Sequence, residues 1–178
     1  MHEFFGILCC YCAVYNAVMH DSFKLDPFDW KLLAALQENA AATNAELSDR
    51  IGLSASQVSR RRQALEEGGL IRRYRALLDR ERLGMSVLVF VHVTMATHSP
   101  DNASRFRQLV LDRREILEAY ALTGDSDYVL KVVVASLKEL SDLINDVLLP
   151  HQSIDRLRSE VVLDVLKEEG NLPMPLSD

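Results

Sequence analysis

The spacing of hydrophobic residues changes near Gly84, and this change divides the chain into two regions. From Asp26 to Gly69 the apolar residues recur at helical intervals, which is typical of helices with one buried face. The first helix is predicted to begin with Asp26 as its cap and Pro27 at its first position, with an apolar stripe of Phe28, Leu32, Leu33 and Leu36. Beyond Gly84, β-rich runs alternate with amphipathic segments. The pattern predicts an α-helical region followed by an α+β region.

Two further helices are predicted by a pair of capping boxes. Residues 43–46 (TNAE) and 54–57 (SASQ) each place a hydroxyl three positions before a carboxylate or amide, and these groups satisfy the free amides of a helix start. Gly52 lies between the boxes, where the end of a helix favours a left-handed residue. Gly68 and Gly69 are expected to end the second helix. Two short helices joined by a glycine turn are typical of a helix-turn-helix.

The second helix of this pair carries the residue types that read DNA bases. Val58 and Leu65 fall on one side and are expected to pack on the preceding helices. The opposite side carries Ser56, Gln57, Arg60 and Gln63. Arginine recognises guanine, glutamine recognises adenine and serine contacts either, whereas Arg61 on the flank suits a phosphate contact. We therefore predict that this helix binds double-stranded DNA.

The distribution of charge supports this prediction although the whole chain is acidic. The 178 residues carry a net charge of -6, yet residues 54–75 contain six arginines and two glutamates, which gives this window +4. A short basic window locates phosphate binding, and the acidic remainder limits nonspecific adhesion. The alternative for a cluster of arginines is a solvated charged face. The position of this cluster on the second of two capped helices favours nucleic-acid binding.

The region after the helix-turn-helix predicts a second fold. Residues 70–78 are expected to be extended and to serve as wing and linker. The elements predicted after them are a strand at 86–96, a helix at 99–113, strands at 118–123 and 128–135, a helix at 137–149 and a strand within 153–167. This order is that of a ferredoxin-like βαββαβ sandwich. Because two helices cover only one face of its sheet, a second copy of the chain is the expected partner for the other face.

The first 23 residues form an N-terminal extension. Residues 1–18 are apolar but too short for a membrane span, and they lack the basic start of a secretory signal. Our preferred interpretation is that Met19 is the true start, and the alternative is an additional N-terminal helix. All three cysteines (Cys9, Cys10 and Cys12) lie here in a spacing unsuited to a metal site, so we predict no metal, no cofactor and no disulfide framework. This cysteine usage fits a reducing cytoplasm.

The chain after Phe23 resembles the Lrp/AsnC (feast/famine) family of bacterial and archaeal transcription regulators. The resemblance is carried by LDPFDWKLLAALQENA, TNAELSDRIGLS, RRRQALEEGGLIRRYRALLD and TGDSDYVLKVVV. It implies an N-terminal helix-turn-helix, a hinge strand and a C-terminal ligand-binding domain that dimerises through its sheet. Family members commonly assemble further into octamers and bind an amino acid between neighbouring dimers.

The predicted fold class is thus α+β, with an N-terminal three-helix winged helix-turn-helix followed by a ferredoxin-like βαββαβ domain for ligand binding and dimerisation. The predicted limits are 1–23 for the extension, 24–70 for the helix-turn-helix, 71–84 for a hinge strand and linker, 85–168 for the effector-binding and oligomerisation domain, and 169–178 for a C-terminal tail.

The predicted site residues form two sets, and the resemblance implies the recognition-helix residues of the first and the residues of the second. The DNA-binding set consists of Thr43, Asn44, Ser54, Ser56, Gln57, Arg60, Arg61, Arg72 and Arg73. The effector-binding set consists of Gly124, Asp125, Asp127, Ser159, Glu160 and Val161. In the Gly-Asp-x-Asp turn, a backbone amide and a carboxylate suit the two charged ends of an α-amino acid. A tight hairpin also needs these residue types, and this remains the alternative.

Three other residues, Arg62, His92 and His98, lie outside these two sets. Arg62 occupies a position where the family usually has an aliphatic residue, and we expect it to extend past the edge of the core or to pair with Glu66. His92 and His98 lack triad-like or metal-like partners in the sequence, so they are expected to be core or surface histidines.

Two other functions compete with an amino-acid-responsive regulator. One is an architectural DNA binder of low specificity, which would use the same residues. The other is an enzyme similar to sirohaem decarboxylases, which resemble this architecture. An enzyme has no need of exposed Ser56, Gln57 and Arg60, and the sequence offers no convincing acid–base pair, so we predict no catalytic residues. The expected protein is cytoplasmic and associated with the nucleoid, without a membrane partner.

Overall fold

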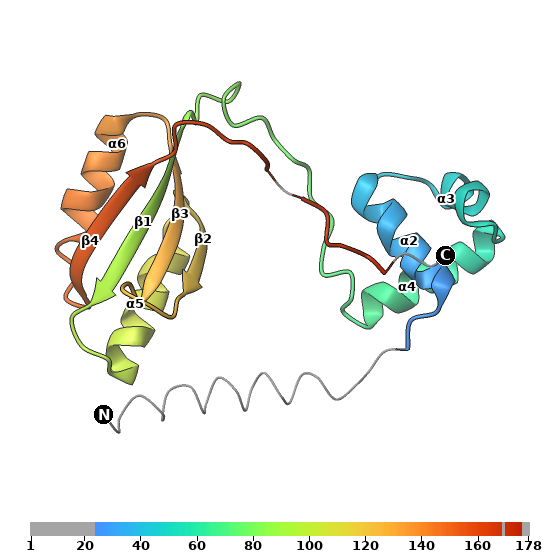
Figure 1. Ribbon diagram of the computed structural model, residues 1–178, viewed down its shortest axis with the longest axis horizontal. Helices are drawn as coiled ribbons and strands as arrows, with labels where there is room; N and C mark the ends of the chain where they lie inside the picture. Colours follow the sequence, from blue (N-terminus) through green and yellow to red (C-terminus); the bar gives the residue numbers. More distant parts are fainter. Residues whose placement is uncertain (1–23, 169, 176–178) are drawn as a thin grey trace. The chain divides into compact units, whose positions relative to one another are not determined.

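The computed structural model describes residues 24–168 and 170–175, which fall into two compact units (Figure 1). The first, here called the N-terminal module, extends to Ala76 and includes the described C-terminal residues from 170 on. The second, here called the sheet domain, comprises Leu77–Glu168. The division lies inside the predicted linker. Met19 and the three cysteines lie outside the described residues, and so do the predictions made about them.

Three capped helices form the N-terminal module: α2 (Pro27–Glu38), α3 (Asn44–Ile51) and α4 (Ala55–Glu67). Each begins with a complete capping box, formed by Asp26 with Asp29, Thr43 with Glu46, and Ser54 with Gln57. Gly52 ends α3 at φ 78°, in the left-handed region where glycine lacks the steric penalty of other residues. These observations confirm the predicted helix-turn-helix.

The helices of the module enclose a small apolar core. It consists of Leu32, Ala35, Leu36, Ala42, Leu47, Ile51, Val58 and Leu65. The prediction for Val58 and Leu65 is therefore confirmed. The predicted stripe of α2 was wrong at Phe28, which is 37% exposed because its ring lies on the surface beside the guanidinium of Arg61.

The sheet domain has the predicted ferredoxin-like order of elements. They are β1 (Val87–Met95), α5 (Pro100–Asp112), β2 (Ile116–Ala121), β3 (Tyr128–Val134), α6 (Leu137–Asp142), the π-helical turn η1 (Leu143–Leu148) and β4 (Ile154–Val161). The strands lie in the order β2-β3-β1-β4, and all neighbours are antiparallel (Figure 1).

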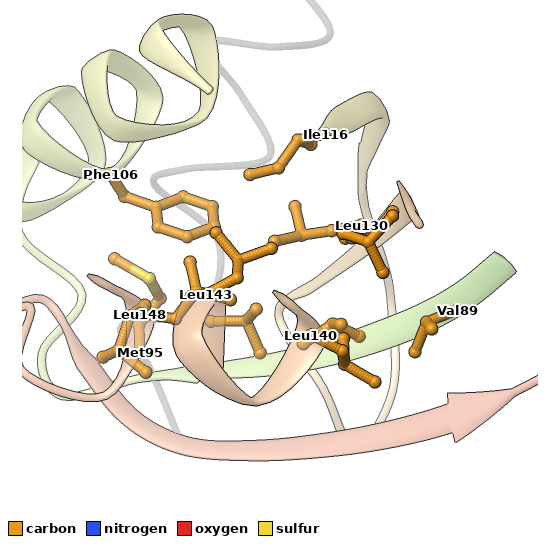
Figure 2. Close-up of a cluster of buried hydrophobic side chains, with 13 residues drawn as sticks. Val89, Met95, Phe106, Ile116, Leu130, Leu140, Leu143 and Leu148 are labelled. Carbon is orange, nitrogen blue, oxygen red and sulfur yellow. The ribbon is translucent and has the colours of Figure 1, made fainter. Parts of the chain in front are cut away.

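The helices of the sheet domain cover one face of the sheet. Phe106 of α5 and Leu140 of α6 meet strand residues such as Leu130 in a single buried cluster (Figure 2). Along β1 the alternate residues Val89, Val91 and Val93 point into this cluster. The side chains between them belong to the other face, which no helix of this domain covers.

Three predicted elements differ from the observed ones. The last strand ends at Val161, short of the predicted end, because its pairing with β1 ends where Val161 meets Val89. The predicted helix 137–149 continues from α6 into a π-helical turn. Residues 72–79 form no helix or strand and pair with no strand of the described chain.

None of the helices in the described ranges is long and apolar enough to cross a lipid bilayer.

Candidate nucleic-acid interface and effector site

The exposed face of α4 presents polar side chains as predicted. Ser56, Gln57 and Arg60 are all exposed. The Gln57 side-chain oxygen accepts hydrogen bonds from the Ser54 amide at 3.0 Å and from the Ser54 hydroxyl at 2.9 Å, so its amide nitrogen is the end that remains for a ligand. Within residues 24–168 and 170–175, the guanidinium of Arg60 has no ion-pair partner. The positively charged guanidinium of Arg60 is therefore available on this face for a contact with DNA.

The other predicted residues of the helix-turn-helix have structural partners. Thr43 and Ser54 each accept a hydrogen bond from the backbone amide three positions on, at 3.2 and 3.3 Å respectively. In the described part of the chain, Asn44 Oδ1 is buried and has no hydrogen-bond partner. The structure thus gives Thr43 and Ser54 a capping function, and direct DNA contacts by these three residues remain predictions.

Arg61 lies in a different environment from Arg60. Its Nη1 contacts Asp26 Oδ2 and Asp29 Oδ1, each at 2.7 Å, and Asp29 is only 8% exposed. The hydrogen bond with Asp29 raises the pKa of Arg61, although its partial burial acts in the opposite direction. Arg61 thereby links α4 to the start of α2, and its predicted phosphate contact is untested.

Arg62 forms the predicted pair with Glu66, at 3.1 Å between Nε and Oε1. Further along the chain, Arg72 and Arg73 are exposed on the segment that follows α4. In the described ranges neither has an ion-pair partner, so both guanidinium groups can reach a phosphate.

The predicted effector turn joins β2 to β3. Gly124 adopts φ 149°, a region that favours glycine, and Asp125 is exposed. Asp127 is already engaged: its Oδ2 accepts a hydrogen bond from the Met95 amide at 2.7 Å, and its own amide donates to the Val93 carbonyl at 2.9 Å. The turn is therefore attached to the end of β1, and Asp125 is its free carboxylate.

The effector residues predicted on β4 lie away from this turn. Val161 pairs with Val89 and Ser159 with Val91, whereas the turn contacts β1 at Val93 and Met95. Val161 thus lies opposite a residue four positions from Val93, roughly 13 Å along β1, and Ser159 lies opposite a residue two positions from it, roughly 7 Å. Glu160 also belongs to the open face of the sheet, with its carboxylate 3.4 Å from His92 Nε2. A single chain does not bring the two predicted groups together.

Two contacts near the turn were not predicted from the sequence. His98 Nε2 lies 3.8 Å from Asp127 Oδ1, although the two residues were assigned no relation. The buried Asn102 of α5 accepts a hydrogen bond from the buried Ser153 hydroxyl, 51 residues away, at 3.3 Å. Sequence spacing gives no signal for either contact, because each joins residues that are far apart in the chain.

Within residues 24–168 and 170–175, no cluster of three or more histidine, cysteine or acidic residues could hold a metal ion. A helix-turn-helix with an exposed reading face, followed by a ferredoxin-like domain, defines the class of two-domain DNA-binding regulators.

Comparisons with known proteins agree with this class. Residues 25–72 match the winged helix-turn-helix DNA-binding family, and residues 88–172 match the Lrp/AsnC ligand binding domain. The glutamate uptake regulatory protein of Zymomonas mobilis is 40% identical over 152 residues, which cover 85% of this chain and 92% of that protein. The leucine-responsive regulatory protein of Haemophilus influenzae is 36% identical over 148 residues, which cover 83% of this chain and 89% of that protein.

Solved structures show the same similarity. A transcriptional regulator from Neisseria meningitidis in complex with L-methionine has a TM-score of 0.82 and 36% identity, covering 84% of this chain and 97% of that one. An AsnC family transcriptional regulator from Agrobacterium tumefaciens has a TM-score of 0.79 and 34% identity, with the same coverage. The chain therefore belongs to the Lrp/AsnC family of DNA-binding transcriptional regulators.

Proposed function

We propose that this regulator binds double-stranded DNA as a homodimer and that an amino acid adjusts its binding or assembly. The observation that carries the proposal is the exposed face of α4, where Ser56, Gln57 and Arg60 are held on a capped helix of a helix-turn-helix. Two such helices in a symmetric dimer reach successive major grooves, so the preferred operator is an imperfect palindrome.

The uncovered face of the sheet supports self-association. It carries the exposed aromatic residues Phe90 and Tyr120 beside the ion pair of Lys131 with Glu118, at 3.3 Å. Apolar surface flanked by paired charges suits a self-complementary interface of two identical chains. Assembly of dimers into an octamer, and action on the nucleoid in the cytoplasm, are further parts of the proposal that rest on the family.

The turn that contains Gly124 and Asp125 is the proposed effector site. The exposed Asp125 carboxylate suits an α-ammonium group, and backbone amides of the turn suit an α-carboxylate. The methionine complex of the Neisseria regulator supports an amino acid as the chemical class. The residues on β4 would contribute from a neighbouring chain, because this chain does not bring them to the turn.

A gel-shift comparison tests the proposal. The full chain is titrated onto the DNA upstream of its own coding sequence and onto random duplex, at two salt concentrations and with each of the twenty amino acids. We expect at least about a thousandfold preference for the upstream DNA, a steep loss of affinity with salt, and a shift caused by one or a few amino acids. Equal, amino-acid-insensitive binding to both duplexes would instead establish an architectural DNA binder.

Substitution at the turn tests the effector site separately. Asp125→Asn is expected to abolish the amino-acid response and to keep basal DNA binding, because the Asp125 side chain has no ion-pair partner in the described ranges. Lys138→Gln serves as the control, because it removes an exposed charge on α6 whose ion-pair partner in the described ranges is Asp142 of the same helix. An unchanged response in Asp125→Asn would exclude the turn as the site.

A further inference from the structure

Arg62 stands at the centre of a compact network on the N-terminal module. Its Nε donates to Glu66 Oε1 at 3.1 Å and to the Tyr74 hydroxyl at 3.0 Å, and the Tyr74 hydroxyl donates to the same Glu66 oxygen at 2.8 Å. The guanidinium carbon also lies 4.7 Å from the centre of the Tyr74 ring. Three side chains thus form a closed set that joins α4 to the segment after it.

The network also reaches the body of the module. Arg62 Nη1 donates to the Ala42 carbonyl at 3.5 Å, in the connection between α2 and α3. A single guanidinium therefore contacts this connection, its own helix and Tyr74. Because its charge is neutralised by Glu66 and its side chain is only 24% exposed, Arg62 is poorly placed to contact a phosphate itself.

A second anchor lies three residues before Tyr74. The amides of Leu70 and Ile71 donate to the Leu65 carbonyl at 3.0 and 3.1 Å, and the Ile71 side chain packs on the apolar core of the module. Ile71 and Tyr74 therefore fix both ends of a two-residue segment. That segment is Arg72 and Arg73, which are both exposed and have no ion-pair partner in the described chain.

We propose that Arg62 is a positioning residue that, through Glu66 and Tyr74, holds Arg72 and Arg73 in place for contacts with the DNA backbone. The assignment rests on the proposed DNA-binding function and adds to it the group that orders the basic segment. Fixing a residue before binding removes the entropy cost of ordering it on the DNA, which amounts to about a fivefold to thirtyfold change in affinity for each backbone position. Disrupting the network should therefore lower the affinity for DNA by a factor of this size, and this loss of affinity can be measured.

The test is a double-mutant cycle on random duplex DNA, where only backbone contacts are sampled. Tyr74→Ala breaks the network without altering net charge, and Tyr74 is 40% exposed, so the fold is expected to survive. It is measured alone and in an Arg72→Gln/Arg73→Gln background. We expect Tyr74→Ala alone to weaken binding about tenfold with an unchanged salt slope. In the double-glutamine background its effect is expected to fall below about twofold, because no arginines remain to be positioned.

A matched pair of charge-removing variants provides the control. Arg62→Leu and Arg50→Leu each remove one arginine and one ion pair with glutamate, but Arg50 pairs with Glu38 and does not touch the segment after α4. Arg62→Leu is expected to weaken binding about tenfold and Arg50→Leu less than about threefold. Thermal unfolding of every variant verifies that the module is folded.

Each outcome decides the assignment. An equal loss for Tyr74→Ala in both backgrounds, or no loss in the unaltered background, would overturn the positioning role while leaving DNA binding intact. A parallel loss for Arg62→Leu and Arg50→Leu would assign the effect to charge alone. If the unaltered chain binds no duplex DNA, the proposed function fails first and the assignment fails with it.

Discussion

Arg60 and Arg61 are neighbours in sequence, yet their surroundings give them different functions. Arg60 is exposed and has no ion-pair partner among the described residues, whereas Arg61 contacts two carboxylates of α2. Successive residues of a helix point about 100° apart, so one side chain can face a ligand while the next is directed at a packed helix.

This difference predicts opposite effects of two equivalent substitutions. Arg61→Ala leaves the nearly buried Asp29 without its cation and is expected to lower the stability of the N-terminal module by about 1–2 kcal/mol. Arg60→Ala is expected to leave stability unchanged and to weaken specific DNA binding about tenfold or more. Urea unfolding followed by circular dichroism, together with gel shifts, measures both properties. Similar stability losses for the two variants would contradict this distinction.

Three carboxylates of the N-terminal module have lowered pKa values. The Thr43 amide and then its hydroxyl lower the pKa of Glu46, and the Tyr74 hydroxyl and then Arg62 lower the pKa of Glu66. Burial alone would raise the pKa of Asp26, but hydrogen bonds from the Asp29 amide and Arg61 lower it overall.

These shifts predict how acid affects stability. Folding lowers the three pKa values, so the folded module binds fewer protons than the unfolded chain and its stabilisation is complete above the ordinary glutamate value of 4.5. The urea midpoint should therefore fall as the pH decreases below about 4.5. Glu46→Gln removes one of the groups, so its midpoint should fall less steeply. A midpoint that stays constant from pH 5 to pH 3 would show that these carboxylates are not linked to folding.

At the scale of elements, the turn between α3 and α4 depends on one backbone conformation. Gly52 adopts φ 78° and an added Cβ would meet no atom within 4 Å, so any cost of substitution comes from the backbone alone. Gly68, at the end of α4, adopts φ -74°, which any residue can take.

The two glycines therefore form a matched pair for substitution. Gly52→Ala is expected to destabilise the module by about 1–2 kcal/mol because alanine is strained in the left-handed region. Gly68→Ala is expected to be neutral or to stabilise by up to about 1 kcal/mol, since it restricts the unfolded chain. Differential scanning calorimetry of the full chain provides the comparison. A larger loss at Gly68 than at Gly52 would contradict the assigned conformations.

The elements that could be predicted from the sequence are those determined locally. Thr43 and Glu46 are three residues apart, so their capping box is visible without a structure. The partners of Arg61 and Asp127 lie 32 residues away, and only the tertiary fold brings them together. The same limit applies to the end of β4: the residues after Val161 are still rich in apolar side chains, but only the tertiary pairing with β1 shows that the strand ends at Val161. The exposure of the candidate site residues was thus predictable from the sequence, and the contacts that support them were not.

At the scale of the whole molecule, the uncovered sheet face predicts a dimer that one substitution can disrupt. Phe90 is 37% exposed at the centre of this face, between Lys131 on β3 and Glu160 on β4. Phe90→Lys is expected to be tolerated in a single chain, because one cross-strand neighbour, Glu160, is acidic and the other, Lys131, is paired with Glu118. In a dimer it would place an ammonium group in a dry interface.

We therefore expect Phe90→Lys to raise the dimer dissociation constant by at least about a hundredfold, as measured by analytical ultracentrifugation. Leu111→Lys is the control, because Leu111 is 72% exposed on α5, on the covered side of the sheet. A Phe90→Lys chain that sediments like the unaltered dimer would exclude this face as the interface.

The three complete capping boxes have a consequence for the order in which the chain folds during synthesis. The helices of the N-terminal module use partners close in sequence, and such low contact order favours rapid folding. The sheet domain must wait for β4, because Val161 near the end of the chain pairs with Val89 in the central strand. On the ribosome, therefore, the three helices of the N-terminal module are expected to fold while the sheet domain is still incomplete. A prematurely terminated chain would then retain a folded helix-turn-helix without the sheet face that is proposed for dimerisation.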